Sequence, residues 1–70
     1  MGVFVNITVN GDRLDVAGPL TISELLRTLD IDALRVAVEH NQVVLKRSTF
    51  DATTIRDGDE IEIVNFVGGG

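Results

Sequence analysis

Hydrophobic and polar residues alternate at the start of the chain. Every second residue of segment 3–9 is Val or Ile, which is the period of a strand with one buried face. The dipeptide Asn10-Gly11 follows and favours a tight hairpin, because both residues tolerate positive φ. Leu14 and Val16 predict a shorter return strand, which Gly18-Pro19 ends because proline cannot donate a ladder hydrogen bond. The chain is therefore predicted to begin with a β-hairpin.

A helix is predicted next. Thr21-Ile22-Ser23-Glu24 fits a capping box, in which the Thr hydroxyl and the Glu carboxylate each satisfy a backbone N–H at the helix start. The helix should begin at about Ile22. Apolar residues then recur at the spacing of one helical face, at Ile22, Leu25, Leu26 and Leu29. This stripe predicts packing against a core.

Two strand-like segments follow, Val36–Glu39 and Val43–Leu45, and His40-Asn41-Gln42 between them predicts a second hairpin. Segment 46–55 is polar apart from Phe50, so we expect a loop or one short helical turn pinned by that ring. Asp57-Gly58-Asp59 is typical of a turn.

Segment 60–64 alternates again and predicts the last strand, with Ile61 and Ile63 inward and Glu60 and Glu62 outward. Five strands with a single helix indicate an α+β fold, in which the helix covers one face of a sheet and the other face stays in water.

Composition narrows the classes of function. Seventy residues predict one domain, and a net charge of −5 argues against nucleic acid as a partner. The absence of cysteine excludes disulfides, thiolate metal ligands and a thiol nucleophile. No apolar run is long enough to span a membrane and no basic or apolar leader is present, so we expect a cytoplasmic protein without a membrane partner.

Few residues are candidates for catalysis or metal binding. His40 is the only histidine, and its place in a turn predicts an exposed residue without a role. Four carboxylates, those of Asp57, Asp59, Glu60 and Glu62, lack the spacing of a calcium loop. They predict a solvated face or, alternatively, a docking patch for a basic partner. Neither a phosphate-binding glycine loop nor a Ser-His-acid constellation is present, so we predict that the chain is not an enzyme.

The sequence ends in Gly68-Gly69-Gly70. This segment is either a frayed terminus without a function or a tail that acts in another protein. We predict a domain over residues 1–66 and a flexible tail over residues 67–70. Four extended residues reach about 13 to 14 Å. Without Cβ atoms such a tail could enter a narrow channel in another protein, at an ordering cost of about 1 to 2 kcal/mol per residue. A C-terminal carboxylate could there become a substrate.

The chain resembles the ThiS family, the sulfur carriers of thiamine biosynthesis. The resemblance rests on Val36-Ala37-Val38-Glu39, Asn41, Arg47-Ser48, Asp57-Gly58-Asp59, Ile61-Glu62-Ile63-Val64 and the final Gly69-Gly70. It spans essentially the whole chain and is strongest in the second half. It implies a β-grasp, or ubiquitin-like, fold: a mixed sheet of four to five strands packed on one main helix, with the first and last strands central and parallel.

The resemblance also implies a chemistry centred on Gly70. An E1-like adenylyltransferase of the ThiF type would use ATP to adenylate the Gly70 carboxylate. A cysteine-derived sulfur donor enzyme would then supply the sulfur of a thiocarboxylate. Thiazole synthase, of the ThiG type, would take that sulfur, and the carrier itself would bind no cofactor.

Other residues are expected to serve this chemistry indirectly. Gly69 and Gly68 would thread the tail into the partner, and Phe66 and Val67 would form an apolar contact where the tail leaves the body. Glu60 and Glu62 are the candidate acidic docking residues.

Other functions stay open. The related small subunit of molybdopterin synthase tends to carry prolines before its glycine pair, where this chain has Asn65-Phe66-Val67 and one extra glycine, Gly68. A ubiquitin-like modifier would instead join Gly70 to a lysine of a target. A binding module acting through its sheet face is the alternative from a different class.

Overall fold

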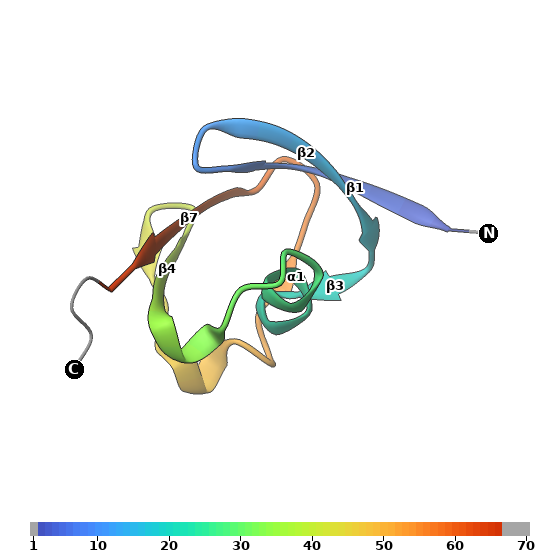
Figure 1. Cartoon of the computed structure of the whole chain (residues 1–70). Helices are drawn as coiled ribbons and strands as arrows, with labels where there is room; N and C mark the ends of the chain where they lie inside the picture. The colour runs from blue at the N-terminus through green and yellow to red at the C-terminus, as the bar shows by residue number, and fades with distance from the viewer. Residues whose placement is uncertain (1, 67–70) are drawn as a thin grey trace.

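The computed structural model describes residues 2–66. Its elements follow in the order β1 (Val3–Val9), β2 (Asp12–Gly18), β3 (Leu20–Thr21), α1 (Ile22–Thr28), η1 (Ala33–Arg35), β4 (Val36–His40), β5 (Val43–Val44), η2 (Arg47–Thr49), β6 (Thr54–Ile55) and β7 (Glu60–Asn65) (Figure 1). The predicted strands and helix are all present. The sequence patterns did not predict the two short strands β3 and β6 or the 3-10 helix η1.

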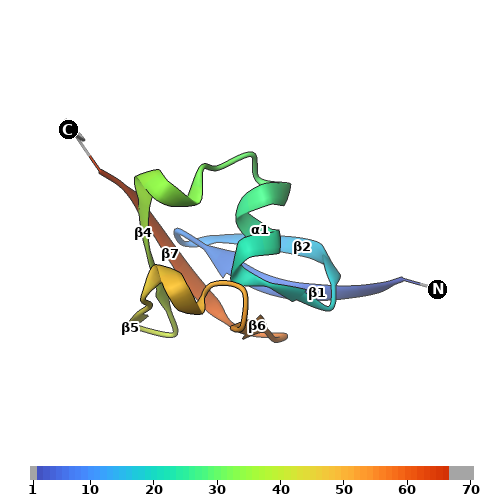
Figure 2. The same cartoon turned by 90° about the horizontal axis from the view of Figure 1, so that it is seen from below.

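Five strands form one mixed sheet in the order β2-β1-β7-β4-β5. β1 and β7 lie at its centre and run parallel, with Thr8 opposite Glu60, and their other neighbours are antiparallel. β3 and β6 pair separately. The sheet curves around α1, which lies against one of its faces (Figures 1 and 2). The predicted α+β fold with one main helix is confirmed.

The capping box forms at the start of α1. The Thr21 hydroxyl accepts a hydrogen bond from the Glu24 N–H at 3.2 Å, and the Glu24 carboxylate accepts one from the Thr21 N–H at 2.8 Å. The predicted apolar stripe is buried except for Leu29, which packs at the margin of the core. The buried core is formed by Val5, Ile7, Val16, Leu20, Ile22, Leu25, Leu26, Val36, Val38, Phe50, Ile55 and Ile61.

Both hairpin turns contain residues with positive φ. Asn10 and Gly11, at 50° and 86°, connect β1 with β2, and Asn41 and Gln42, at 50° and 71°, connect β4 with β5. Asn10 has a second function. Its Oδ1 accepts a hydrogen bond from the Ile63 N–H at 2.7 Å, and its Nδ2 donates to the Ile63 carbonyl at 3.1 Å. The side chain of this turn residue therefore binds the backbone of β7.

The loop between β5 and β6 contains η2 and packs under the start of α1. Phe50 is 3% exposed, which confirms that this ring pins the loop. The carbonyl of Phe50 accepts a hydrogen bond from the Ser23 N–H, and the carbonyl of Thr53 accepts one from the Ile22 N–H. The loop thus satisfies two backbone donors that the first turn of a helix leaves without partners.

Candidate docking face and tail exit

The predicted tail itself, residues 67–70, lies outside the described residues, so its predicted working residues Val67, Gly68, Gly69 and Gly70 stay predictions. The last described residue is Phe66. Its N–H donates a hydrogen bond to the carbonyl of Arg35 at 2.9 Å, although β7 ends one residue earlier. The Phe66 side chain is 54% exposed. The point from which residues 67–70 leave is therefore held to the end of η1.

The two candidate docking glutamates lie on the open face of the sheet. Along β7 the buried Ile61 alternates with the exposed Glu60 and Glu62, as predicted. Glu62 lies directly opposite Glu39 of β4, which faces the same way because it follows the buried Val38. Like charges directly opposite each other in a sheet disfavour folding. This pair therefore stabilises nothing in the isolated chain, and it leaves the open face acidic.

Exposed apolar side chains lie beside these carboxylates. Val64 is 57% exposed and follows Glu62 on the open face, and Val44 is 68% exposed and lies opposite Glu39 on β5. The open-face patch is defined here as Glu39, Val44, Glu60, Glu62 and Val64. It extends over the open face of β4, β5 and β7, and β7 ends one residue before Phe66.

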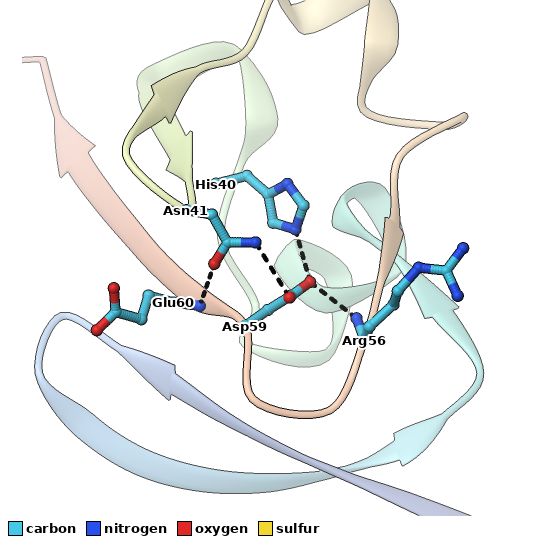
Figure 3. Close-up of polar contacts among 5 residues, drawn as sticks. All are labelled: His40, Asn41, Arg56, Asp59 and Glu60. Carbon is cyan, nitrogen blue, oxygen red and sulfur yellow. Dashed lines mark hydrogen bonds and ion pairs between the residues drawn. The ribbon is translucent and has the colours of Figure 1, made fainter.

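The prediction that His40 is an exposed turn residue is wrong. His40 is the last residue of β4, its side chain is 20% exposed, and its Nε2 lies 2.6 Å from Oδ2 of Asp59 (Figure 3). The Asp59 carboxylate, 13% exposed, also accepts hydrogen bonds from Asn41 Nδ2 at 3.1 Å and from the Arg56 N–H at 2.9 Å. These four residues, His40, Asn41, Arg56 and Asp59, form the Asp59 clamp.

The Asp59 clamp fixes the start of β7. Asn41 Oδ1 accepts a hydrogen bond from the Glu60 N–H at 2.9 Å (Figure 3). The Asn41 N–H donates to the Glu60 carbonyl at 2.8 Å. The turn between β4 and β5 is in this way joined to the first residue of β7. Figure 3 shows the Arg56 guanidinium pointing away from Asp59, so Arg56 contributes its backbone.

The charge of Asp59 follows from these contacts. Burial alone would raise the pKa of its carboxyl, but the hydrogen bonds from the Arg56 N–H, His40 and Asn41, together with attraction to His40, outweigh burial. The net result is a pKa below the ordinary value of 3.8. Asp59 is therefore an ionised structural acceptor at neutral pH.

The other acid of the turn binds β1. Asp57 Oδ1 accepts a hydrogen bond from the Asn6 N–H at 2.7 Å, and the Gly58 N–H donates to the Asn6 carbonyl at 2.7 Å. Gly58 has a φ of +87°, a region that glycine enters without steric cost. Of the four carboxylates predicted to form a solvated face, only Glu60 and Glu62 do so without a bond to the fold. For Asp59 that prediction is wrong.

Arg47, one of the residues on which the family resemblance rests, also has a structural contact. Its Nε donates a hydrogen bond to the carbonyl of Ala33 at 3.0 Å, which joins η2 to η1. Because η1 ends at Arg35, whose carbonyl binds Phe66, Arg47 indirectly supports the exit point.

Residues 2–66 contain neither a metal-binding cluster nor a membrane-spanning helix. In this part of the chain no group of His, Asp and Glu side chains is arranged to hold a metal ion. Nor does any helix there combine the length and hydropathy needed to cross a bilayer.

A mixed five-stranded sheet with its first and last strands central and parallel, curved around a single helix, defines a β-grasp, or ubiquitin-like, domain. A model of the ThiS family matches residues 5–70. The chain belongs to the ThiS family.

A solved structure supports the assignment over nearly the full length. The crystal structure of the thiamine biosynthesis protein (ThiS) from Geobacter metallireducens is 48% identical and superposes with a TM-score of 0.82. The match covers 94% of this chain and 100% of that one. Fold and family therefore agree.

Two curated relatives differ in length. The sulfur carrier protein ThiS of Bacillus subtilis is 38% identical over 50 residues, which is 71% of this chain and 76% of that protein. The thiazole synthase of Paramagnetospirillum magneticum is 35% identical over 66 residues. That match covers 94% of this chain, but this chain spans only 20% of the length of that synthase.

Proposed function

We propose that the chain is a sulfur carrier protein of thiamine biosynthesis. The observation that carries this proposal is the match of the ThiS family model through the last residue, Gly70. The similarity to the Bacillus subtilis sulfur carrier and to the Geobacter protein supports it. In this function the chain is a protein substrate of partner enzymes and not itself an enzyme.

The proposed chemistry takes place at the Gly70 carboxylate. An E1-like adenylyltransferase attaches AMP from ATP to this carboxylate and releases pyrophosphate. A cysteine-derived sulfur donor enzyme, together with a thiol reductant, then supplies sulfur at the oxidation level of sulfide; this sulfur attacks the acyl carbon, and AMP leaves to give a thiocarboxylate. The carrier binds no cofactor in this scheme, and the ATP is consumed by the partner.

Thiazole synthase is the proposed acceptor of the sulfur. A segment similar to this chain makes up one fifth of the Paramagnetospirillum magneticum thiazole synthase. Where a carrier-like segment and a synthase share one polypeptide, their effective concentration is high. This arrangement supports direct transfer between the two proteins where they are separate chains.

The surface around the exit point is the proposed docking region. Phe66 is half exposed where residues 67–70 leave the body, and Glu60 and Glu62 present charge on the open face. Docking through this region would supply the free energy that is needed to order the glycines in a partner's channel. We place the whole process in the cytoplasm, where the lack of disulfides is ordinary.

The deciding experiment is intact mass spectrometry. The 70-residue chain is incubated with an adenylyltransferase of the ThiF type, ATP and a sulfur donor, beside an established carrier as positive control. We expect the mass increase of one oxygen replaced by sulfur, localised to the C-terminal peptide. Failure of the chain to gain sulfur while the control gains it would overturn the proposal.

A truncated variant tests which residues react. Removal of Gly69 and Gly70 should abolish sulfur loading and leave the thermal unfolding midpoint unchanged, since terminal glycines add no side chain to a core. Complementation separates the pathways: the full chain should restore growth without thiamine to a strain that lacks its own thiamine sulfur carrier. Rescue of a molybdopterin-deficient strain alone would assign the chain to the other pathway.

A further inference from the structure

β1 begins two residues before the residues that the family model matches. Its first residue is Val3, whereas the ThiS family model starts at Val5. Val3 and Phe4 are 59% and 71% exposed, and they pair with Gly18 and Ala17 of β2. This start of β1 projects beyond α1 and the rest of the sheet (Figures 1 and 2). The start of β1 is therefore an exposed apolar segment.

The other side of this segment is open. β7 pairs with β1 only at Thr8 and Val9, and the turn before β7 reaches back to Asn6. The N–H groups of Asn6 and Thr8 both point toward β7. Because a strand repeats every two residues, the N–H and C=O of Phe4 and Gly2 point the same way. Within residues 2–66 no hydrogen bond outside the β1–β2 ladder reaches these groups.

This edge lacks the features that protect strand edges from pairing. Segment 2–5 carries no charged side chain and no proline. The outer edge of β2, by contrast, contains Asp12, Arg13 and Asp15, and β5 at the opposite edge is only two residues long. Charges and short length are the usual means of keeping an edge unpaired. The start of β1 is thus the edge of the sheet best suited to accept another strand.

We propose that residues 2–5 of two copies of the chain pair antiparallel, with Val3 opposite Val3 of the second copy. Gly2 then faces Phe4 of the second copy, and Phe4 faces its Gly2. Each of these pairs exchanges two backbone hydrogen bonds, since their N–H and C=O groups point toward the edge. The Phe4 ring covers the neighbouring glycine, a pairing that compensates for the missing side chain. The two hairpins become one four-stranded antiparallel sheet.

The geometry argues for a second copy over the chain's own tail. Val9 at the end of β1 pairs with Ile61 near the start of β7. The path along β1 from Val3 to Val9, continued along β7 from Ile61 to Phe66, is therefore about 36 Å long. Residues 67–70 span at most about 14 Å, so they cannot return to this edge. The uncharged edge also lets two copies meet without like charges in contact, although each chain has a net charge of −5.

The size of the contact sets its strength. A four-residue edge buries far less than the roughly 1,600 Å² of a standard stable interface, so the dimer is weak and reversible. It also keeps the exit point accessible, because β1 starts at the end of the molecule opposite to the end of β7 (Figure 1). The dimer and the proposed sulfur-carrier function use different ends of the molecule, so each can be tested without the other.

Sedimentation velocity of the 70-residue chain over a range of concentrations tests the dimer. We expect the weight-average mass to rise from that of the monomer toward twice that value at the highest concentrations. Phe4→Lys should abolish this rise, because it places a charge on the edge. Val44→Lys is the matched control, since it makes the same change of charge at a similarly exposed residue of the other edge, and it should dimerise like the wild type. A monomer at every concentration, or loss of the dimer in Val44→Lys alone, would overturn the proposal.

Amide exchange locates the contact. In NMR spectra the Phe4 N–H should exchange freely in dilute solution and become protected as the concentration rises, while the Phe66 N–H should not change. Gly2→Pro should weaken dimerisation without loss of stability, because it removes only a donor that faces the open edge. Concentration-dependent shifts confined to the open-face patch, with none in residues 2–5, would show a different interface and would rule out this pairing.

Discussion

The two central strands lie side by side and run parallel, yet the fold holds them very differently. β7 begins at the Asp59 clamp, has β4 on one side along its whole length and has β1 and Asn10 on the other side as far as Ile63, and it is followed by the hydrogen bond from Phe66 to Arg35. β1 has partners on both sides only from Asn6 onward, and its first residues contact β2 alone. Long-range polar contacts are thus concentrated on the strand that leads to residues 67–70. The difference is that the end of β7 is joined to η1 by a backbone hydrogen bond beyond the strand, whereas the start of β1 has β2 as its partner and an open edge on the other side.

The largest difference between the two strands should appear on truncation of their apolar side chains. Ile61→Ala in β7 should lower the free energy of unfolding by about 2 to 5 kcal/mol, because Ile61 is 1% exposed and its removal leaves a cavity. Val3→Ala in β1 should change it by less than about 0.5 kcal/mol, because Val3 is mostly exposed. Urea unfolding followed by circular dichroism measures both, and equal losses would contradict the contrast.

Removal of the clamp tests whether β7 depends on polar contacts. Asp59→Ala should cost about 1 to 3 kcal/mol, because the Arg56 N–H, the Asn41 amide and His40 lose their acceptor. Asp51→Ala, an exposed carboxylate in the loop before β6, is the matched control and should be nearly neutral. Amide exchange at Glu60 should rise in the first variant only. If both variants unfold at the same urea concentration, the clamp does not stabilise β7.

Acid should weaken the same contact. The pKa of Asp59 is lowered in the folded state, so its contribution to stability is complete above the ordinary pKa of 3.8 and is lost as the pH falls through the lower folded value. The stability gap between the wild type and Asp59→Asn should therefore narrow as the pH is lowered from 7 into this range. Urea unfolding at a series of pH values measures the gap, and a constant gap would show that the carboxylate charge is not what the clamp requires.

The smallest effect is expected on the open face of β7. Glu62→Gln relieves the repulsion from Glu39 and should stabilise the fold by at most about 0.5 kcal/mol at low salt, with the gain disappearing at high salt. The same variant should slow adenylation if the patch steers a basic partner. Thermal unfolding at two salt concentrations and the initial rate of adenylation give the two readings. A loss of stability would mean that Glu62 has a favourable contact in the fold.

Local patterns predicted most of the fold. Alternation in segments 3–9 and 60–64, the capping box at Thr21 and the turn at Asn10-Gly11 all correspond to what forms, because each depends on residues close in sequence. β3, β6 and η1 could not be predicted this way. The two short strands exist only because they pair with each other, Leu20 with Ile55 and Thr21 with Thr54, across a long separation in sequence.

The site was predicted less completely for the same reason. His40 and Asp59 are 19 residues apart, and Asn10 and Ile63 are 53 apart, so neither contact leaves a signal in a local pattern. The resemblance includes Asn41 and Asp57-Gly58-Asp59, but the sequence predicts only a turn for the latter and assigns Asn41 no contact. The structure shows the contacts of Asn41 and Asp59 in the clamp. Outward Glu60 and Glu62 were predicted correctly, since strand alternation is a local property.

In the proposed function, the hydrogen bond between Phe66 and Arg35 also sets a limit on the depth of the partner's active site. Measured from Phe66, residues 67–70 extend at most about 13 to 14 Å, so a reacting group in a partner must lie within that distance of the surface that contacts Phe66. A deeper catalytic centre would require the end of β7 to separate from β4, and each residue released would add about 3.3 Å. A carrier of the proposed kind would thereby discriminate among partner enzymes by the depth of their catalytic centres.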